Sequence, residues 1–170
     1  GNRLYFLIGD ISGKGVPASL FMAITRSLFR TLSQQVLSPA KIVTDMNNSI
    51  SDNNESNMFV TLIVGILDLE TGKLKLCNAG HNPPILIRPD GQVSFLEFKT
   101  QIFVGVIEEF AYTEDETTLE KGSKLFLYTD GVTEAENTEK ELYGDEKLLK
   151  TLSDNNTSDV RTTVNGIVDS

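Results

Sequence analysis

Two aspartates follow apolar segments and precede turns that contain glycine. Asp10 comes after the apolar run 4–8, and Asp130 comes after the apolar run 125–128. A carboxylate at the end of a strand is held by a rigid sheet while it faces a cleft. Aspartate oxygens are ligands that hard cations such as Mg²⁺ and Mn²⁺ prefer. The pair is therefore a candidate metal site, but aspartate also caps turns without any ligand, and the residue types alone favour that simpler interpretation.

Other catalytic motifs do not fit the spacing. A P-loop ending at Lys14 would need glycine at position 8 and serine or threonine at position 15, and the chain has neither. A nucleophile elbow at Ser12 would need glycine at positions 10 and 14, which are also absent. His81 is the single histidine, so the chain holds no histidine cluster for zinc. Cys77 precedes it by a spacing that is not diagnostic, and a lone strand cysteine is usually a small core residue.

The apolar pattern predicts the elements that would position these residues. The continuous apolar run 3–9 is expected to be a buried strand. Leucine and isoleucine at positions 20, 24, 28 and 32 predict a helix over residues 16–35 with one apolar stripe. A second helix is expected to begin at Pro39, because Ile42, Val43, Met46 and Ile50 recur on one side.

The middle of the chain is predicted to be mostly β. Strands are expected over residues 59–69, 73–77, 85–88, 93–98, 111–118 and 124–129. The stretch 51–57, rich in Asn, Ser and Asp, is expected to be a loop. Helical periodicity returns after Gly144, first at Leu148, Leu149 and Leu152, then at Val160, Val164, Ile167 and Val168. Strands between helices predict an α+β domain built on antiparallel sheets.

The composition limits the class of protein. The 170 residues fit one domain, with 15 basic and 24 acidic residues and a net charge of −9. This acidity argues against nucleic acid or an anionic membrane as the partner, since both reward basic residues. No apolar run approaches the ~18 residues of a membrane span, and the start lacks a signal-peptide pattern. One cysteine excludes an internal disulfide, which fits a cytoplasmic location.

Four motifs resemble those of one known family. Residues 9–18 (Gly-Asp-Ile-Ser-Gly-Lys-Gly-Val-Pro-Ala) are similar to the Gly-Asp-Val-Ser-Gly-His/Lys-Gly motif of bacterial metal-dependent Ser/Thr phosphatases of the SpoIIE/RsbU type. These phosphatases belong to the PPM (type 2C) superfamily. Residues 78–84 (Asn-Ala-Gly-His-Asn-Pro-Pro), 127–135 (Leu-Tyr-Thr-Asp-Gly-Val-Thr-Glu-Ala) and 142–144 (Leu-Tyr-Gly) resemble three further family motifs. The motifs keep the family order, and together they cover most of the chain.

The resemblance implies a fold and a metal site. The family fold is a sandwich of two antiparallel β-sheets flanked by helices (α/β/β/α), with Mn²⁺ or Mg²⁺ between the sheets. Asp10 matches the aspartate that bridges two metals, Ile11 matches the position whose backbone carbonyl binds a metal, and Asp130 matches a second metal-binding aspartate. Gly131 matches the glycine that lets the backbone come close beside it. Two metals acidify a bridging water that attacks phosphorus, so the catalytic residues Asp10 and Asp130 act through bound metals.

His81 has two interpretations within this family. Its imidazole could protonate the leaving serine oxygen, or it could fix the tight turn 80–84 by hydrogen bonding. The stiff Pro-Pro sequence that follows favours the second interpretation. Lys14 could meet a substrate phosphate or be a solvated loop residue. The acidic stretches 108–120 and 134–146 are expected to be solvated faces.

The chain departs from the family pattern at both ends. The pattern places Gly-Gly-Asp-x-Tyr-Asp before residue 3 and Asp-Asp-x-Thr after the last helix, and each segment carries a metal-binding carboxylate. We therefore expect residues 1–170 to be a single domain truncated at both ends, with terminal strands missing. Such a chain should bind Mn²⁺ or Mg²⁺ weakly or not at all. Its open sheet edges would favour pairing between copies into a homodimer.

The functional prediction is a metal-dependent protein serine/threonine phosphatase domain in bacterial signalling. The resemblance implies that its substrate is a phosphorylated regulatory protein, such as a STAS-fold anti-sigma-factor antagonist. It also implies an N-terminal sensor or receiver domain in the parent protein. The alternative is a non-catalytic module that uses the PPM scaffold to bind a partner. Hydrolysis of a phosphoprotein by the parent, with and without Mn²⁺, would separate the two.

Overall fold

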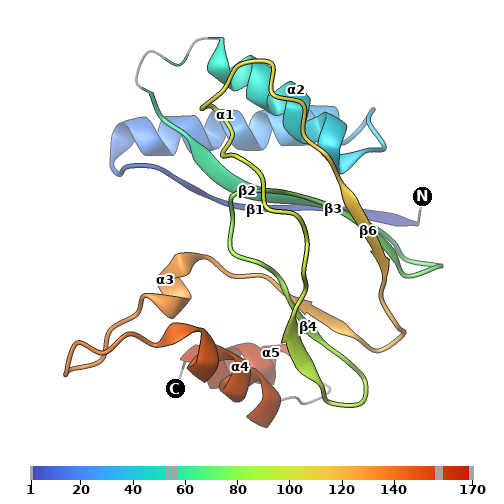
Figure 1. Cartoon of the computed structure of the whole chain (residues 1–170), viewed down its shortest axis with the longest axis vertical. Helices are drawn as coiled ribbons and strands as arrows, with labels where there is room; N and C mark the ends of the chain where they lie inside the picture. Colours follow the sequence, from blue (N-terminus) through green and yellow to red (C-terminus); the bar gives the residue numbers. More distant parts are fainter. Residues whose placement is uncertain (1, 53, 55–56, 156–158, 169–170) are drawn as a thin grey trace. The chain divides into compact units, whose positions relative to one another are not determined.

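The computed structural model describes residues 2–52, 54, 57–155 and 159–168 (Figure 1). The chain divides into two compact units. The first unit contains Gly1–His81 and Phe98–Leu119, and the second contains Asn82–Glu97 and Glu120–Ser170. The prediction that residues 1–170 make a single domain stays a prediction. Among the described helices, none has the length and apolar character needed to cross a membrane.

The first unit is an antiparallel sheet with helices α1 and α2 on one face (Figure 1). Its elements are β1 (Arg3–Ile11), α1 (Val16–Leu32), α2 (Pro39–Ser51), β2 (Val60–Asp68), β3 (Lys73–Ala79) and β6 (Asp115–Thr118). The strand order is β1-β2-β3-β6. The predicted apolar side of α2 is buried and packs into one core with β2. That core includes Ile42, Val43, Met46, Ile50, Val60, Leu62 and Val64.

Strand β1 is half-buried, which corrects the prediction of a buried strand. In the described part of the chain it pairs with β2 alone, so its other edge has no neighbouring strand. Gly9 allows a close approach to β2 just before Asp10. A Cβ on Gly9 would lie 2.7 Å from the carbonyl oxygen of Thr61 and 2.9 Å from Cβ of Leu62. Glycine at this position therefore brings the end of β1 against β2.

Helix α1 corrects the prediction of one apolar stripe. Leu20 and Ile24 are 61% and 53% exposed, whereas Thr25 is fully buried and Phe21 packs against the core. An α-helix has 3.6 residues per turn, so a four-residue repeat rotates by about 40° at each step. The stripe therefore winds around the helix, from solvent at Leu20 to the core at Leu32.

Strand β6 is shorter than predicted, because a side chain takes the place of the strand ladder. The side-chain amide of Gln101 accepts a hydrogen bond of 2.8 Å from the main-chain N–H of Thr113 and donates one of 2.9 Å to the main-chain oxygen of Thr113. Regular pairing with β3 begins only at Asp115. The predicted loop 51–57 includes residues 53, 55 and 56, which lie outside the described residues, and Ser51 belongs to α2.

The second unit is a short antiparallel sheet with three helices in its described part. Its elements are β4 (Ile85–Ile87), β5 (Val93–Phe95), β7 (Lys124–Phe126), α3 (Asp130–Thr133), α4 (Gly144–Asp154) and α5 (Val160–Val168). The strand order is β5-β4-β7. Its core is formed by Ile85, Ile87, Tyr128, Leu148 and Leu152. These two sheets with their helices confirm the predicted α+β class, and the face-to-face packing of the sheets stays a prediction.

Candidate functional site

Asp10 presents a carboxylate to solvent near the end of β1. The residue is exposed and lies directly opposite Thr61 of β2. Its Oδ1 accepts a hydrogen bond of 2.9 Å from the main-chain N–H of Ile11. Among the described residues, its Oδ2 has no hydrogen-bond partner. One oxygen is therefore fixed by the chain, and the other is available to a ligand.

The main-chain carbonyl of Ile11 points away from β2. Val60 lies opposite Ile11, and both its N–H and its carbonyl form hydrogen bonds of 3.0 Å with Val104 instead. Ladder bonds alternate along an antiparallel pair, so Ile11 occupies a position that is not hydrogen-bonded to β2. Its carbonyl oxygen is directed to the open edge of β1. The carboxylate of Asp10 and this carbonyl are neighbouring oxygen donors, which is the chemistry that Mg²⁺ and Mn²⁺ select.

Asp130 begins helix α3 and does not end a strand, which corrects the predicted likeness to Asp10. Strand β7 ends at Phe126, paired with Ile85. Two prolines precede Ile85, and proline has no N–H with which to continue the ladder. The half-buried carboxylate of Asp130 has no hydrogen-bond partner within the described part of the chain. Nearby Tyr128 is buried, and burial raises the pKa of its phenol to about 12.

The fold of the second unit does not itself require glycine at position 131. A Cβ on Gly131 would meet only Thr129 Oγ1, at the ordinary contact distance of 3.7 Å. Gly131 was predicted to let the backbone come close to the metal site. Because its protein neighbours leave room for a Cβ, that role would depend on a bound ligand. That role stays a prediction.

The candidate ligands belong to different units. Asp10 and Ile11 are in the first, and Asp130 and Gly131 are in the second. Within the described residues, no group of three His, Cys, Asp or Glu side chains is placed to hold a metal ion. Each aspartate nevertheless offers the open oxygen donor that Mg²⁺ or Mn²⁺ needs. A site shared by Asp10 and Asp130 stays a prediction.

His81 is buried behind the end of β1, in the first unit. The residue is only 4% exposed, and Nδ1 of its imidazole lies 3.0 Å from Thr61 Oγ1. The turn at His81 is held by Asn78, whose side chain accepts from His81 N–H at 2.8 Å and donates to His81 O at 3.0 Å. Gly80 has φ +77°, and a Cβ there would lie 2.0 Å from the ring of Phe103. The Asn78 amide therefore fixes this turn, while the imidazole reaches Thr61.

Thr61 was not singled out from the sequence, although a signal was present. It is a polar residue within the predicted apolar strand 59–69. Asn78 belongs to a recognised motif, but its role as the clamp of the turn follows only from its contacts.

The alternative catalytic residues do not form competing sites. Burial raises the pKa of the Cys77 thiol to about 12, so the nucleophilic thiolate is disfavoured at neutral pH. Ser12 Oγ accepts a hydrogen bond of 2.9 Å from Phe59 N–H, which ties the loop after β1 to the start of β2. Lys14 is exposed in that loop.

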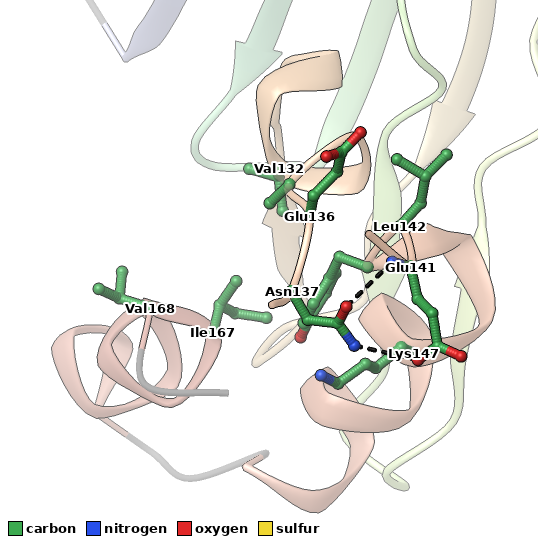
Figure 2. Close-up of a pocket in the computed structure, with 10 residues that line it drawn as sticks. Val132, Glu136, Asn137, Glu141, Leu142, Lys147, Ile167 and Val168 are labelled. Atoms are coloured by element: carbon green, nitrogen blue, oxygen red, sulfur yellow. Dashed lines mark hydrogen bonds between the residues drawn. The ribbon is translucent and has the colours of Figure 1, made fainter. Parts of the chain in front are cut away.

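A cavity of about 420 Å³ lies beside α3 in the second unit (Figure 2). It is lined by Val132, Ala135, Glu136, Asn137, Glu141, Leu142, Tyr143, Lys147, Ile167 and Val168. Figure 2 shows that Asn137 faces Glu141, and the amide Nδ2 donates a 3.0 Å hydrogen bond to Oε2. The Lys147 ammonium lies 4.7 Å from the centre of the Tyr143 ring. Asn137 and Lys147 thus contact other residues of the lining, and six of the ten lining residues are apolar or aromatic.

The fold is that of PP2C-type protein phosphatases. The crystal structure of the RsbU and RsbW domains of Rv1364c from Mycobacterium tuberculosis matches with a TM-score of 0.83, at 23% identity, over 99% of this chain and 46% of that one. The SiaA-PP2C domain of Pseudomonas aeruginosa matches with a TM-score of 0.81, at 18% identity, over 99% of this chain and 72% of that one. The catalytic domain of the serine threonine protein phosphatase PstP, in complex with 2 manganese ions, matches with a TM-score of 0.70, at 14% identity, over 99% of this chain and 83% of that one.

Sequence comparison assigns the family. Residues 1–170 match the model of the Stage II sporulation protein E (SpoIIE) family. The chain is 31% identical to Protein IcfG of Synechocystis sp., over 89% of this chain and 28% of that protein. It is 27% identical to Phosphoserine phosphatase RsbU of Bacillus subtilis, over 96% of this chain and 48% of that protein. The chain therefore belongs to the SpoIIE family, as its motifs predicted, and it spans less than half the length of these relatives.

Proposed function

We propose that this chain is the catalytic domain of a metal-dependent protein serine/threonine phosphatase. The observation that carries the proposal is the pair of oxygen donors at the end of β1. The open Oδ2 of Asp10 lies in the residue next to Ile11, whose carbonyl points outward. Membership of the SpoIIE family supports the proposal, as do the phosphoserine phosphatase RsbU and the manganese-containing PstP among the similar proteins.

The residues that would hold the metal are Asp10, Asp130 and the Ile11 carbonyl, with Gly131 leaving room beside them. We propose that the two carboxylates face one cleft. Bound Mn²⁺ or Mg²⁺ would acidify water and offset the charge of the phosphoryl oxygens. The chain itself fixes one oxygen of Asp10 through the Ile11 N–H and presents the other. These two carboxylates supply two negative charges against the four positive charges of two dications. We therefore expect these residues alone to bind the metal weakly, with the second ion lost first.

The proposed substrate is a phosphorylated serine or threonine on a regulatory protein, such as a STAS-type anti-sigma-factor antagonist. Its support is the similarity to RsbU and to the RsbU and RsbW domains of Rv1364c. We also propose an N-terminal sensor or receiver domain in the parent protein and a cytoplasmic location. A phosphoprotein of this kind, incubated with the parent and Mn²⁺, should lose its phosphate. Retention of the phosphate on that protein, with release from other phosphoproteins, would redirect the substrate assignment.

Asp10→Asn in the full-length parent tests the proposed chemistry. Asparagine keeps the shape but removes the charge that would hold a metal, so most Mn²⁺-dependent hydrolysis should be lost while the fold is retained. Asp90→Asn is the matched control, because Asp90 is an exposed turn residue whose Oδ1 accepts from Gln92 N–H at 3.0 Å. The control should keep full activity. Hydrolysis by Asp10→Asn at the unchanged rate would contradict the mechanism.

The two interpretations of His81 are separated by His81→Ala. We expect this change to cost less activity than Asp10→Asn and to lower the melting temperature, because the residue is buried and hydrogen-bonded to Thr61. A complete loss of activity with an unchanged melting temperature would instead favour a general acid.

A second candidate function is a non-catalytic module that binds a partner protein. The candidate ligands are divided between two units, and among the residues that the structure describes neither unit alone supplies three His, Cys, Asp or Glu side chains placed to hold a metal, which favours this candidate. Specific binding of a phosphoprotein by the parent, without hydrolysis in Mn²⁺ or Mg²⁺, would support this candidate.

We also propose that copies pair through the open edge of β1 into a homodimer. A sedimentation mass that stays monomeric at all concentrations would reject the dimer.

A further inference from the structure

Thr61 links the buried histidine to the peptide that carries Asp10. Thr61 lies opposite Asp10 in the pairing of β1 with β2. Its Oγ1 is 3.0 Å from His81 Nδ1 and 3.4 Å from the main-chain oxygen of Asp10. The second distance is longer than an ordinary O–H···O bond, so it describes an oriented hydroxyl dipole more than a strong bond. All three residues belong to the first unit.

The position of the imidazole is set by the chain around it and not by solvent. His81 is 4% exposed, and the Asn78 amide holds both its N–H and its carbonyl. The ring of Phe103 packs where a Cβ of Gly80 would stand, and it stacks on Phe59 with ring centres 5.1 Å apart. The burial of the residue and its clamped main chain therefore keep His81 beside Thr61.

One direction of the two hydrogen bonds would link all three residues. A threonine hydroxyl carries a single hydrogen. If that hydrogen points to the carbonyl oxygen of Asp10, the contact with His81 needs a hydrogen from Nδ1. The imidazole then donates to Thr61 Oγ1, and Thr61 donates to Asp10 O.

This direction matters because of the peptide group that receives it. The carbonyl of Asp10 and the N–H of Ile11 belong to one planar peptide unit. That N–H donates the 2.9 Å hydrogen bond to Oδ1 of Asp10. Asp10 and Thr61 form the hydrogen-bonded pair next to Ile11, so the strand ladder holds the carbonyl end of this unit and the Thr61 hydroxyl adds a second, weaker contact to it. A contact that orients this carbonyl also orients the N–H end, and with it the carboxylate.

We propose that His81, with its proton on Nδ1, and Thr61 are positioning residues for the carboxylate of Asp10. The assignment rests on the proposed function, in which Asp10 holds a metal. His81 acts through Thr61 and the Asp10–Ile11 peptide, and it does not itself touch the reacting atoms. It is thus distinct from both the general acid and the turn-fixing residue expected from the sequence.

The single histidine makes the first test direct, because one ¹⁵N-labelled imidazole gives one unambiguous set of NMR signals. At pH 8 the unchanged 170-residue chain should show the Nδ1–H tautomer. Thr61→Val keeps the branched shape of the side chain but removes the hydroxyl, so the tautomer should change to Nε2–H. Thr61→Ser is the matched control, since it keeps the hydroxyl and should keep the Nδ1–H tautomer. An Nε2–H tautomer in the unchanged chain would overturn the proposed direction.

The second test measures Mn²⁺ affinity by calorimetric titration of the same three proteins. Loss of a residue that supports a metal ligand weakens binding by roughly 10-fold, so Thr61→Val should show a loss of about that size and Thr61→Ser almost none. Backbone NMR spectra should be alike in all three, which separates positioning from unfolding. Equal Mn²⁺ affinity in Thr61→Val and the unchanged chain would overturn the link to Asp10. If the unchanged 170-residue chain binds too weakly to titrate, as these residues alone lead us to expect, the same titration on the full-length parent decides the link to Asp10, and failure of the unchanged parent to bind Mn²⁺ would count against the proposed metal site. The tautomer decides the hydrogen-bond network in either case.

Discussion

Glu114 joins the start of helix α2 to strand β3, and its charge should stabilise the first unit. Its Oε2 accepts from the Ser38 hydroxyl at 2.5 Å and from Ala40 N–H at 3.2 Å, and its Oε1 accepts from the Lys75 ammonium at 2.9 Å. Burial by itself raises the pKa of Glu114, but the hydrogen bonds from Lys75, Ser38 and Ala40 outweigh it and leave the pKa lowered. The ionised form is thus favoured in the folded chain.

Glu114→Gln keeps the size of the side chain and removes this charge. The ion pair with Lys75 is partly exposed, at 37% and 22% of the two side chains, so its loss costs about 1 kcal/mol. Loss of a negative charge at the start of a helix costs roughly 0.5 kcal/mol more. We expect a destabilisation of about 1.5 kcal/mol at pH 7, or roughly tenfold in the unfolding constant. Glu116→Gln is the matched control, because Glu116 pairs with Lys73 at 50% and 46% exposure and should cost under about 0.5 kcal/mol.

The pH dependence provides the sharper test. Because the pKa of Glu114 is lowered on folding, its stabilisation is fully present above the unfolded value of 4.5 and is lost as pH falls through the lower folded value. Urea denaturation followed by circular dichroism measures the free energy of unfolding of Glu114→Gln and of the unchanged chain. The difference between the two free energies should shrink as pH falls below 4.5. The control difference should stay small throughout. A Glu114→Gln difference that is constant down to pH 3, or no larger than the control, would refute the reasoning.

Three further predictions concern the site and its support. Gly80→Ala should lower stability by about 2 kcal/mol in thermal unfolding, because the left-handed φ is strained and the Phe103 ring must move; an unchanged melting temperature would contradict this. Gly131→Ala should leave the melting temperature unchanged, since the new Cβ meets only Thr129 at 3.7 Å, but should reduce phosphatase activity of the parent. Full activity would argue against a close approach of ligand there. The buried Cys77 thiol, with its pKa raised to about 12, should react with a disulfide reagent only after denaturation, and rapid reaction of the native chain would disprove its burial.

Local sequence was sufficient for much of the secondary structure. Pro39 and the spacing of Ile42, Met46 and Ile50 predicted α2 correctly, because the helical period depends on near neighbours. Residues 9–18 and the three later motifs predicted the family and the fold class, which the comparisons confirm. The same motifs singled out Asp10 and Asp130 as candidate ligands. Their meeting in one site remains a prediction, because it depends on the placement of two units and not on either motif.

Tertiary structure decided what each of these residues contacts. Leu20 and Ile24 looked like core positions, yet they are exposed because the packed face of α1 is set by its neighbours in the unit. Strand β7 ends at Phe126 because its partner strand is preceded by prolines about forty residues earlier in the chain. Thr61 and His81 are separated by 20 positions, and strand pairing brings their side chains within 3.0 Å of each other. Periodicity is a property of adjacent residues, whereas burial, strand length and hydrogen-bond partners depend on segments that only the folded chain brings together.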